Sequence, residues 1–237
     1  MFEVDPMASE VVNAPGLTLN RNALAQTTMR RITRRHRAFG KRAIDILVAL
    51  TAILLLSPLL VCIALMIRKG GTAAIYSHRR VGRRGQPFPC YKFQSMVANA
   101  DVILSEHLAA NPAAAEEWRL KRKLKVDPRV TRFGRVLRES SVDELPQLFN
   151  ILRGDMSFVG PRPIMFEELA QYGHSVRDYF AVRPGLTGLW QVSGRNTLDF
   201  SERVEFDQHY VRNQTLFYDL TIILRTVPEV MWRRRTS

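Results

Sequence analysis

The feature that most constrains this chain is an apolar run from residue 43 to residue 67, "AIDILVALTAILLLSPLLVCIALMI", in which Asp45 is the one charged residue. At 1.5 Å per residue, a helix of about 25 residues is long enough to cross the hydrocarbon core of a bilayer. A secretory signal peptide is a poorer interpretation, because the run starts far from the first residue and no small-residue cleavage site follows it. The run therefore predicts a membrane helix.

Pro58 predicts that this helix is not straight. Proline cannot donate to the carbonyl of Leu54 and its ring crowds that carbonyl, while the Ser57 hydroxyl can satisfy a freed backbone acceptor. Seven Lys or Arg lie between Arg30 and Arg42, and six lie between Arg68 and Arg84. Because positive charge favours the cytoplasmic side, we interpret the run as a re-entrant helix broken at Ser57 and Pro58. A kinked helix that crosses completely is the alternative.

The chain divides into three predicted regions. Residues 1–40 read as a mobile basic N-terminal tail, residues 41–69 as the re-entrant membrane helix, and residues 70–237 as one soluble-facing domain on the cytosolic face. Glycines and prolines between residues 82 and 89 predict a small β-hairpin. Helices are expected over residues 98–125, from Asp143 to about Leu152, and over 165–172 and 200–211, and the segment "DPRVTRFGRVLR" predicts a turn into another helix. The fold class is mainly α with a small β-hairpin, α+β.

The C-terminal segment "LFYDLTIILRTVPEVMWRRR" predicts one more helix, which either lies amphipathically in the membrane interface or packs against the core. The formal charge of +13 implies an anionic partner: nucleic acid, an anionic membrane or phosphorylated molecules. Nucleic acid is disfavoured because the basic residues flank the apolar run, with no recognisable reading helix. Cys62 and Cys90 form no disulfide framework, and the five histidines show no zinc pattern.

The stretch "RESSVDELPQLFNILRGDMSFVGPRP" holds the candidate reactive groups, the adjacent carboxylates of Asp143 and Glu144. The simple alternative is a capping box, in which Ser141 and Glu144 begin a helix. Pro146 argues against that, because its ring would crowd the carbonyl of Val142 inside such a helix. We therefore expect the helix to begin at Asp143. Both carboxylates would then lie at an electropositive helix end, where a phosphate also binds.

Basic residues around this stretch suit phosphate chemistry. Arg162 stands between two prolines, and a guanidinium binds phosphate oxygens in a planar fork. The segment "RPGLTGLWQVSGRN" adds Arg183 and Arg195 among glycines, which permit close backbone approach. Lys92 and Arg138 are further candidate phosphate ligands. The sequence has no GxxxxGK[ST] motif, so a Walker-type site is excluded.

These motifs resemble the bacterial sugar transferases, monotopic phosphoglycosyl transferases of the short exopolysaccharide-priming type. The resemblance runs from about Lys41 to Trp232 and rests on an ordered set of segments: "KRAIDILVALTAILLLSPLL", "RRVGRRGQPF", "YKFQSM", "DPRVTRFGRVLR", "DELPQLFNILRGDMSFVGPRP", "VRPGLTGLWQVSGRN" and "FYDLTIIL". Two positions depart from the family pattern: Gln94 stands where many members carry arginine, and "GLW" at residues 188–190 stands where "GWA" is common.

The resemblance implies roles for these positions. Asp143 is expected to attack the sugar-bearing phosphorus and to hold a sugar-phosphoryl intermediate, and Glu144 is expected to coordinate Mg²⁺. Phosphate or nucleotide binding is implied for Lys92, Arg138, Arg162 and Arg183. Ser57 and Pro58 match the helix-breaking pair of the family, with both helix ends on the cytoplasmic face.

The expected function is transfer of a hexose 1-phosphate, galactose or glucose, from a UDP-sugar to undecaprenyl phosphate at the bacterial inner membrane. This step would begin exopolysaccharide synthesis, with Mg²⁺ as cofactor and inner-membrane lipids as surroundings. A non-catalytic membrane scaffold and a basic membrane-tethered binding protein are the alternatives. Whether the chain forms a homodimer is left open.

Overall fold

The computed structural model describes residues 21–121, 124–194 and 198–232, and its internal contacts divide the chain into two units, Met1–Lys41 and Arg42–Ser237. In the first unit, the described residues belong to the helix α1, Arg21–Lys69. Residues 21–40 are therefore helical where the sequence predicts a mobile tail. Their Ala, Leu, Met and Arg residues favour helix, so the helical conformation extends backwards from the apolar run.

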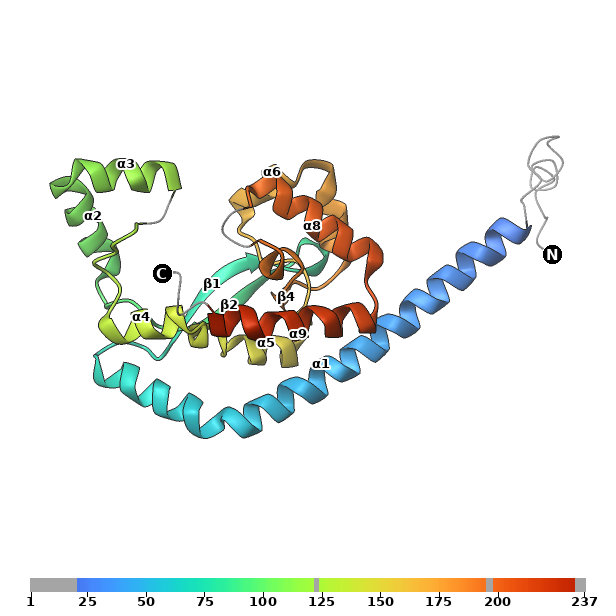
Figure 1. Ribbon diagram of the computed structural model, residues 1–237, viewed down its shortest axis with the longest axis horizontal. Helices are drawn as coiled ribbons and strands as arrows, with labels where there is room; N and C mark the ends of the chain where they lie inside the picture. The colour runs from blue at the N-terminus through green and yellow to red at the C-terminus, as the bar shows by residue number, and fades with distance from the viewer. Residues whose placement is uncertain (1–20, 122–123, 195–197, 233–237) are drawn as a thin grey trace, which may run out of the picture. The chain divides into compact units, whose positions relative to one another are not determined.

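Within the second unit, α1 continues through Pro58 as one helix. The Ser57 hydroxyl donates to the carbonyl of Leu54 at 2.8 Å, as predicted, and Figure 1 shows α1 bending along its cyan part. The predicted interruption is thus a bend inside a continuous helix. Residues Phe39–Lys69 have a mean hydropathy of 2.9 in their most apolar window, of which 11% is buried, so by length and composition this helix can cross a membrane.

One stripe of α1 packs against the rest of its unit, both before and after Pro58. Ala49 belongs to a core cluster with Phe88, Leu148 and Ile151. Beyond the proline, the buried side chains of α1 join a second cluster with Phe93 and Leu137; they are Leu60, Ile63 and Ile67. The spacing of these residues by three, four and seven places them on one helix face.

The predicted hairpin is confirmed. Strand β1 (Ile75–Val81) pairs antiparallel with β2 (Pro87–Phe93), with Ile75 opposite Phe93 and Val81 opposite Pro87. The turn contains the short helix η3 (Arg83–Gly85), in which Arg84 has a positive φ of 61°. A second pairing was not predicted: the short strands β3 (Ser157–Val159) and β4 (Gly185–Thr187) lie parallel.

Helices make up most of the remaining domain, as predicted. They are α2 (Ala100–Ala110), α3 (Pro112–Lys121), α4 (Arg132–Glu139), α5 (Gln147–Arg153), α6 (Leu169–Tyr172), α7 (Val176–Ala181), α8 (Phe200–Asn213) and α9 (Leu216–Trp232). Short 3₁₀ turns lie between them: η4 (Val142–Glu144), η5 (Phe166–Glu168), η6 (Gly173–Ser175) and η7 (Trp190–Val192). Pro112 begins α3, so the segment expected to be helical from residue 98 to 125 contains two helices.

The predicted helix start at Asp143 is wrong. Asp143 and Glu144 lie in η4, and α5 begins at Gln147, with Pro146 as its N-cap residue. Ser141 has a positive φ of 58° and makes no side-chain cap hydrogen bond, so the capping box is absent as well. The left-handed conformation of Ser141 ends the preceding helical segment. Pro146 has no backbone N–H to donate, so it fits only at the beginning of the next helix. The carboxylates therefore precede α5.

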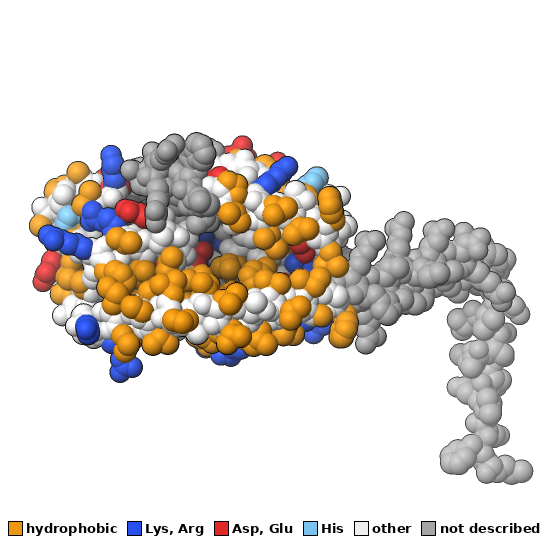
Figure 2. Space-filling model, turned by 60° about the horizontal axis from the view of Figure 1, so that its bottom comes forward, with side chains coloured by type: hydrophobic (Ala, Val, Ile, Leu, Met, Phe, Trp, Pro, Cys, Tyr) orange, Lys and Arg blue, Asp and Glu red, His pale blue; other side chains and the backbone are white. Residues whose placement is uncertain are grey.

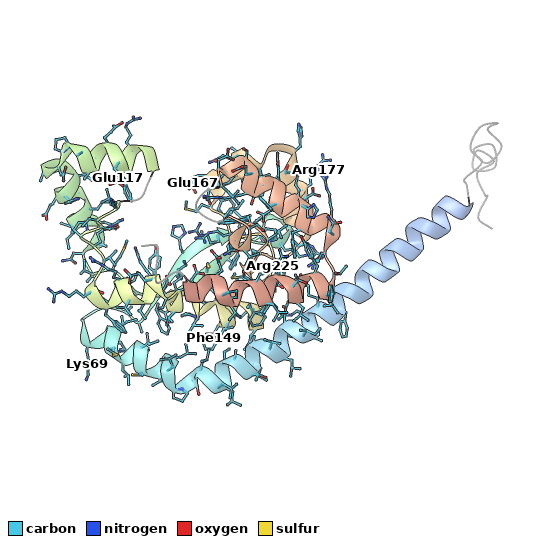
Figure 3. All side chains as sticks on the ribbon, viewed as in Figure 1. Lys69, Glu117, Phe149, Glu167, Arg177 and Arg225 are labelled. Carbon is cyan, nitrogen blue, oxygen red and sulfur yellow. The ribbon has the colours of Figure 1, made fainter. Side chains whose placement is uncertain are left out.

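Helix α9 is buried on one face and exposed on another. Its residues Asp219 and Ile222 are buried, whereas Phe217 is 80% and Leu224 is 63% exposed. Ile222 packs in a core cluster with Val159 of β3, and Figure 3 labels Arg225 on this helix. The helix thus packs on the core by one face and presents apolar side chains on another.

Candidate active site

Three charged side chains come together where the hairpin meets η4. The ammonium group of Lys92, on β2, lies 2.7 Å from Oε1 of Glu144 and 4.0 Å from Oδ2 of Asp143. Asp143 is 8% exposed. The positive φ of Ser141 is a costly conformation for a residue other than glycine. This backbone turn presents both carboxylates toward the hairpin.

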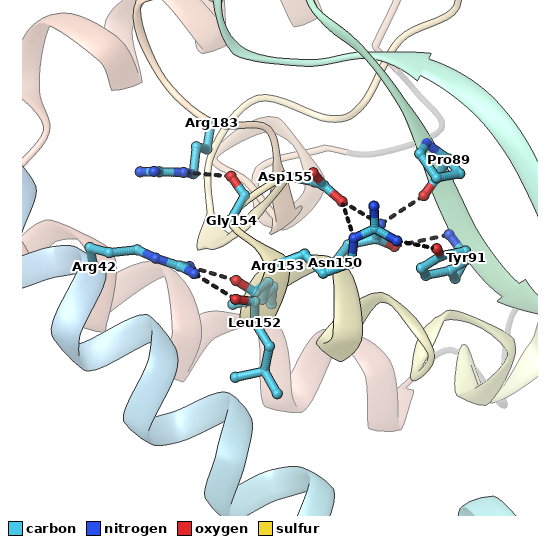
Figure 4. Close-up of polar contacts among 10 residues, drawn as sticks. Arg42, Pro89, Tyr91, Asn150, Leu152, Arg153, Gly154, Asp155 and Arg183 are labelled. Atoms are coloured by element: carbon cyan, nitrogen blue, oxygen red, sulfur yellow. Dashed lines mark hydrogen bonds and ion pairs between the residues drawn. The ribbon is translucent and has the colours of Figure 1, made fainter.

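Asn150 of α5 fixes the distance between that helix and the hairpin. Its fully buried amide donates to the carbonyl of Pro89 at 2.7 Å and accepts from the amide of Tyr91 at 3.0 Å. The guanidinium of Arg153 reaches the Tyr91 hydroxyl at 2.6 Å. Figure 4 shows these bonds between α5 and the hairpin. Because Lys92 follows Tyr91 in the chain and η4 precedes α5, the same bonds help to hold the lysine near the carboxylates.

A cavity of about 780 Å³ lies beside these charges. Among the predicted site residues, Lys92, Arg138, Asp143, Glu144 and Arg162 all line it. Arg138 is oriented by a 2.8 Å hydrogen bond from its Nε to the Ser95 hydroxyl. The cavity is large enough for a nucleotide-sized ligand, and its cations suit one that carries phosphate groups.

The thiol of Cys90 also lines this cavity and is disfavoured as a nucleophile. Burial raises the pKa of the Cys90 thiol to about 11, so the thiolate is scarce at neutral pH. Both Cys62 and Cys90 are free thiols, as predicted. The carboxylates of Asp143 and Glu144 therefore remain the candidate reactive groups.

The donor set fits magnesium. Mg²⁺ is usually held by one or two carboxylates, with substrate phosphates and water completing its octahedron. Glu144 and Asp143 supply two adjacent carboxylates at a cavity rich in phosphate-binding side chains. No group of three or more His, Cys, Asp or Glu side chains that could hold a metal occurs within the described part of the chain.

Arg183 lies apart from the cavity. Its Nε donates to the carbonyl of Gly154 at 2.7 Å, and Arg42 donates to the carbonyls of Ile151 and Leu152 at 2.5 and 2.8 Å (Figure 4). Burial and the charge of Arg42 lower the pKa of Arg183. The two arginines satisfy carbonyls at the C-terminal end of α5. We therefore do not place Arg183 with the phosphate-binding groups. The predicted ligand Arg195 lies outside the described residues.

The sequence prediction missed several residues that line the cavity. His78 and Arg80 lie two positions apart on β1, on the same face of the strand, and both line the cavity. Gln191 of η7 lines it as well. Strand alternation along β1 is a signal that points to the first two. Gln191 has no such signal, because it enters the cavity through the fold of the loop after β4. Gln94 and Trp190, which lie where this sequence differs from the family pattern, also line the cavity.

One protein family and several known proteins are similar to this chain. The family described as "Bacterial sugar transferase" matches residues 36–233. The "Undecaprenyl-phosphate galactose phosphotransferase" of Salmonella typhimurium is 49% identical over 85% of this chain and 42% of its own length. The "Exopolysaccharide production protein ExoY" of Sinorhizobium fredii is 50% identical over 82% of this chain and 87% of its own. The "UDP-glucose:undecaprenyl-phosphate glucose-1-phosphate transferase" of Escherichia coli is 38% identical over 79% of this chain and 39% of its own.

Proposed function

Because the chain belongs to the bacterial sugar transferase family, we propose that it transfers a hexose 1-phosphate from a UDP-sugar to undecaprenyl phosphate, as the first step of exopolysaccharide synthesis. The name of the Escherichia coli relative gives this reaction with glucose as the sugar, and the name of the Salmonella relative gives an undecaprenyl-phosphate galactose phosphotransferase. The observation that carries the proposal is the convergence of Asp143 and Glu144 with Lys92, Arg138 and Arg162 on one cavity.

In the proposed reaction, a carboxylate oxygen of Asp143 attacks the phosphorus that bears the sugar. The bond between that phosphorus and the bridging oxygen breaks, and uridine monophosphate leaves with the electron pair. A phosphate oxygen of undecaprenyl phosphate then attacks the same phosphorus and expels the Asp143 carboxylate. The products are undecaprenyl-diphosphate-sugar and uridine monophosphate. Lys92, Arg138 and Arg162 hold the phosphate oxygens and neutralise their charge.

Glu144 is the proposed protein ligand for Mg²⁺, with Asp143 adjacent to it. A bound magnesium ion would supply charge neutralisation at the diphosphate. In the structure Glu144 is paired with Lys92. The lysine thus holds the carboxylate in position and prevents two neighbouring anions from lying unpaired at the cavity wall.

The packing of α1 supports a re-entrant arrangement on the cytoplasmic face of the inner membrane. Ala49 contacts the core that contains α5, and Ile67 contacts the core that contains α4, so both ends of the apolar run lie on the same domain. A helix that crossed the bilayer would carry one end away from that domain. The bend at Pro58 and the buried Asp45, which accepts from the amide of Phe158 at 3.2 Å, agree with this arrangement.

The exposed apolar surface supports the same membrane position. Large hydrophobic side chains are exposed on α1, as at Leu54 and Leu55 (73% each), and on α9, as at Phe217. Phe149 of α5 is 46% exposed. Figure 2 shows hydrophobic side chains spread over the face that α1 contributes to. Such a surface fits the lipid side of a protein that lies in one leaflet.

The central experiment measures release of uridine monophosphate from UDP-galactose and UDP-glucose by the detergent-purified protein with undecaprenyl phosphate. Asp143→Asn is expected to abolish release, and retention of most activity would refute the nucleophile assignment. Glu144→Gln is expected to raise the Mg²⁺ concentration needed for half-maximal activity; an unchanged titration would refute its role as ligand.

A second experiment tests the membrane arrangement. Single cysteines at positions 38 and 72, in a background without Cys62 and Cys90, are labelled in intact cells and in inverted vesicles with a reagent that cannot cross the membrane. The re-entrant arrangement predicts labelling of both positions in vesicles alone. Opposite accessibility of the two positions would establish a crossing helix.

A further inference from the structure

Gln191 is a cavity residue whose side chain is buried without a complete set of hydrogen bonds. The residue is 8% exposed, yet its Oε1 has no hydrogen-bond partner. A buried carbonyl oxygen left unpaired carries a desolvation penalty, so such groups in native proteins call for an explanation. Gln191 lines the large cavity, where another buried atom, Nδ1 of His78, is also without a partner.

The local fold holds the Gln191 amide in one orientation. Its backbone amide donates to the carbonyl of Gly188 at 3.1 Å, and its Nε2 lies 3.5 Å from the carbonyl of Leu186. This contact directs the nitrogen toward the backbone and leaves the oxygen as the free end of the amide. A β-carbon at Gly188 would lie 3.1 Å from Oε1 and 2.4 Å from the carbonyl of Gly160. The glycine therefore leaves space beside the oxygen.

The position of Gln191 indicates which part of a nucleotide sugar would lie next to it. A small recess beside the main cavity is lined by Gln191 together with Lys92, Glu144 and Arg162. These are the groups that the proposed function assigns to the reacting phosphate and to the metal. In a UDP-hexose, the hexose is bonded directly to the reacting phosphorus, whereas the uracil is separated from it by the second phosphate and the ribose. The hexose is thus the neutral part nearest to Gln191.

The chemistry of Oε1 agrees with this assignment. A carbonyl oxygen accepts hydrogen bonds and cannot bind the acceptor oxygens of a phosphate group. Hexose hydroxyls are donors. On the basis of the proposed function, we propose that Gln191 is a specificity-determining residue whose Oε1 accepts a hydrogen bond from a hydroxyl group of the donor hexose.

The test compares UDP-galactose, UDP-glucose and their monodeoxy analogues as donors for the wild type and for Gln191→Met. A buried acceptor that loses its donor discriminates strongly against the deoxy substrate. We expect one deoxy analogue to lose at least tenfold in kcat/KM with the wild type. In Gln191→Met, which has a similar volume and no acceptor, this penalty should fall below threefold.

Two further variants separate recognition from a structural role. Gln191→Glu retains an acceptor at the same position and should retain the deoxy penalty, whatever its overall rate. Gln171→Met, at an exposed glutamine on α6 outside the cavity, should behave as the wild type. An undiminished deoxy penalty in Gln191→Met, or an equal loss for every donor, would overturn the inference. If the wild type releases no uridine monophosphate from any UDP-hexose, the proposed function itself fails, and this inference fails with it.

Discussion

Replacement of Lys92 by methionine tests how the charges of the site depend on one another. The ammonium group lies 2.7 Å from Glu144 and 4.0 Å from Asp143. At an effective dielectric constant of 20, unit charges 4 Å apart interact by about 4 kcal/mol. The Lys92 side chain is 29% and the Glu144 side chain 23% exposed, so water weakens this interaction. We take about 2 kcal/mol, within the range for a hydrogen bond to a charged group.

An interaction of the same strength between Lys92 and a donor phosphate in the transition state predicts a loss of about 30-fold in kcat/KM for Lys92→Met, since about 1.4 kcal/mol corresponds to a factor of ten. The variant removes the cation that neutralises both the carboxylates and the phosphates of the donor. Lys92→Arg retains the charge and should lose less activity. The assay is the initial rate of uridine monophosphate release over a range of UDP-sugar concentrations.

Lys125→Met provides the matched control, because Lys125 is exposed and does not line the cavity. It should retain the wild-type rate. Thermal unfolding in detergent establishes that each variant is folded. A loss of less than threefold in a folded Lys92→Met protein would refute the coupling of this lysine to the reaction.

Three further predictions concern the framework around the site. In Gly134→Ala the new β-carbon would lie 2.0 Å from the carbonyl oxygen of Ser95. We expect the free energy of unfolding to fall by about 3 kcal/mol and the midpoint of thermal unfolding to fall by about 10 °C. An unchanged midpoint would contradict the contact. Burial raises the pKa of Asp207 from 3.8 to about 7, so between these values the folded protein keeps a proton that the unfolded chain releases. This contribution to stability is lost as the pH rises from about 4 to 7. Asp207→Asn should flatten the decline of the urea unfolding midpoint over this pH range, and a pH profile identical to that of the wild type would refute the shift. Arg42→Met removes both hydrogen bonds to the C-terminal end of α5 and should lower the unfolding midpoint more than Arg42→Lys does; equal midpoints for the two variants would show that the forked contact contributes nothing.

The site could be predicted from the sequence only in part. Asp143, Glu144 and Lys92 were identified from motifs, and the structure brings them together although 52 positions separate Lys92 from Glu144. The helix start next to the carboxylates was misplaced. Pro146 argued against a helix that starts at Ser141, but the sequence did not indicate that Ser141 adopts a left-handed conformation and that the helix begins only after Pro146.

The arginines illustrate a second limit. Arg162 and Arg183 each stand before a proline, and from the sequence both suit phosphate binding equally well. In the structure Arg162 lines the cavity, whereas Arg183 donates to the carbonyl of Gly154. The same guanidinium chemistry serves phosphate oxygens in one place and helix-end carbonyls in the other. Which of the two an arginine meets depends on contacts far away in the chain.

The sequence by itself determined those features that depend on neighbouring residues. An apolar run of about 25 residues favours a membrane helix, Pro58 bends it, and β-prone segments around a glycine turn form a hairpin. Only the tertiary structure decided which face of α1 is buried, which basic residues share the cavity and that Gln191 lies there with an unpaired oxygen. These outcomes depend on long-range packing, such as Arg42 meeting Ile151 across 109 positions, which local propensities do not specify.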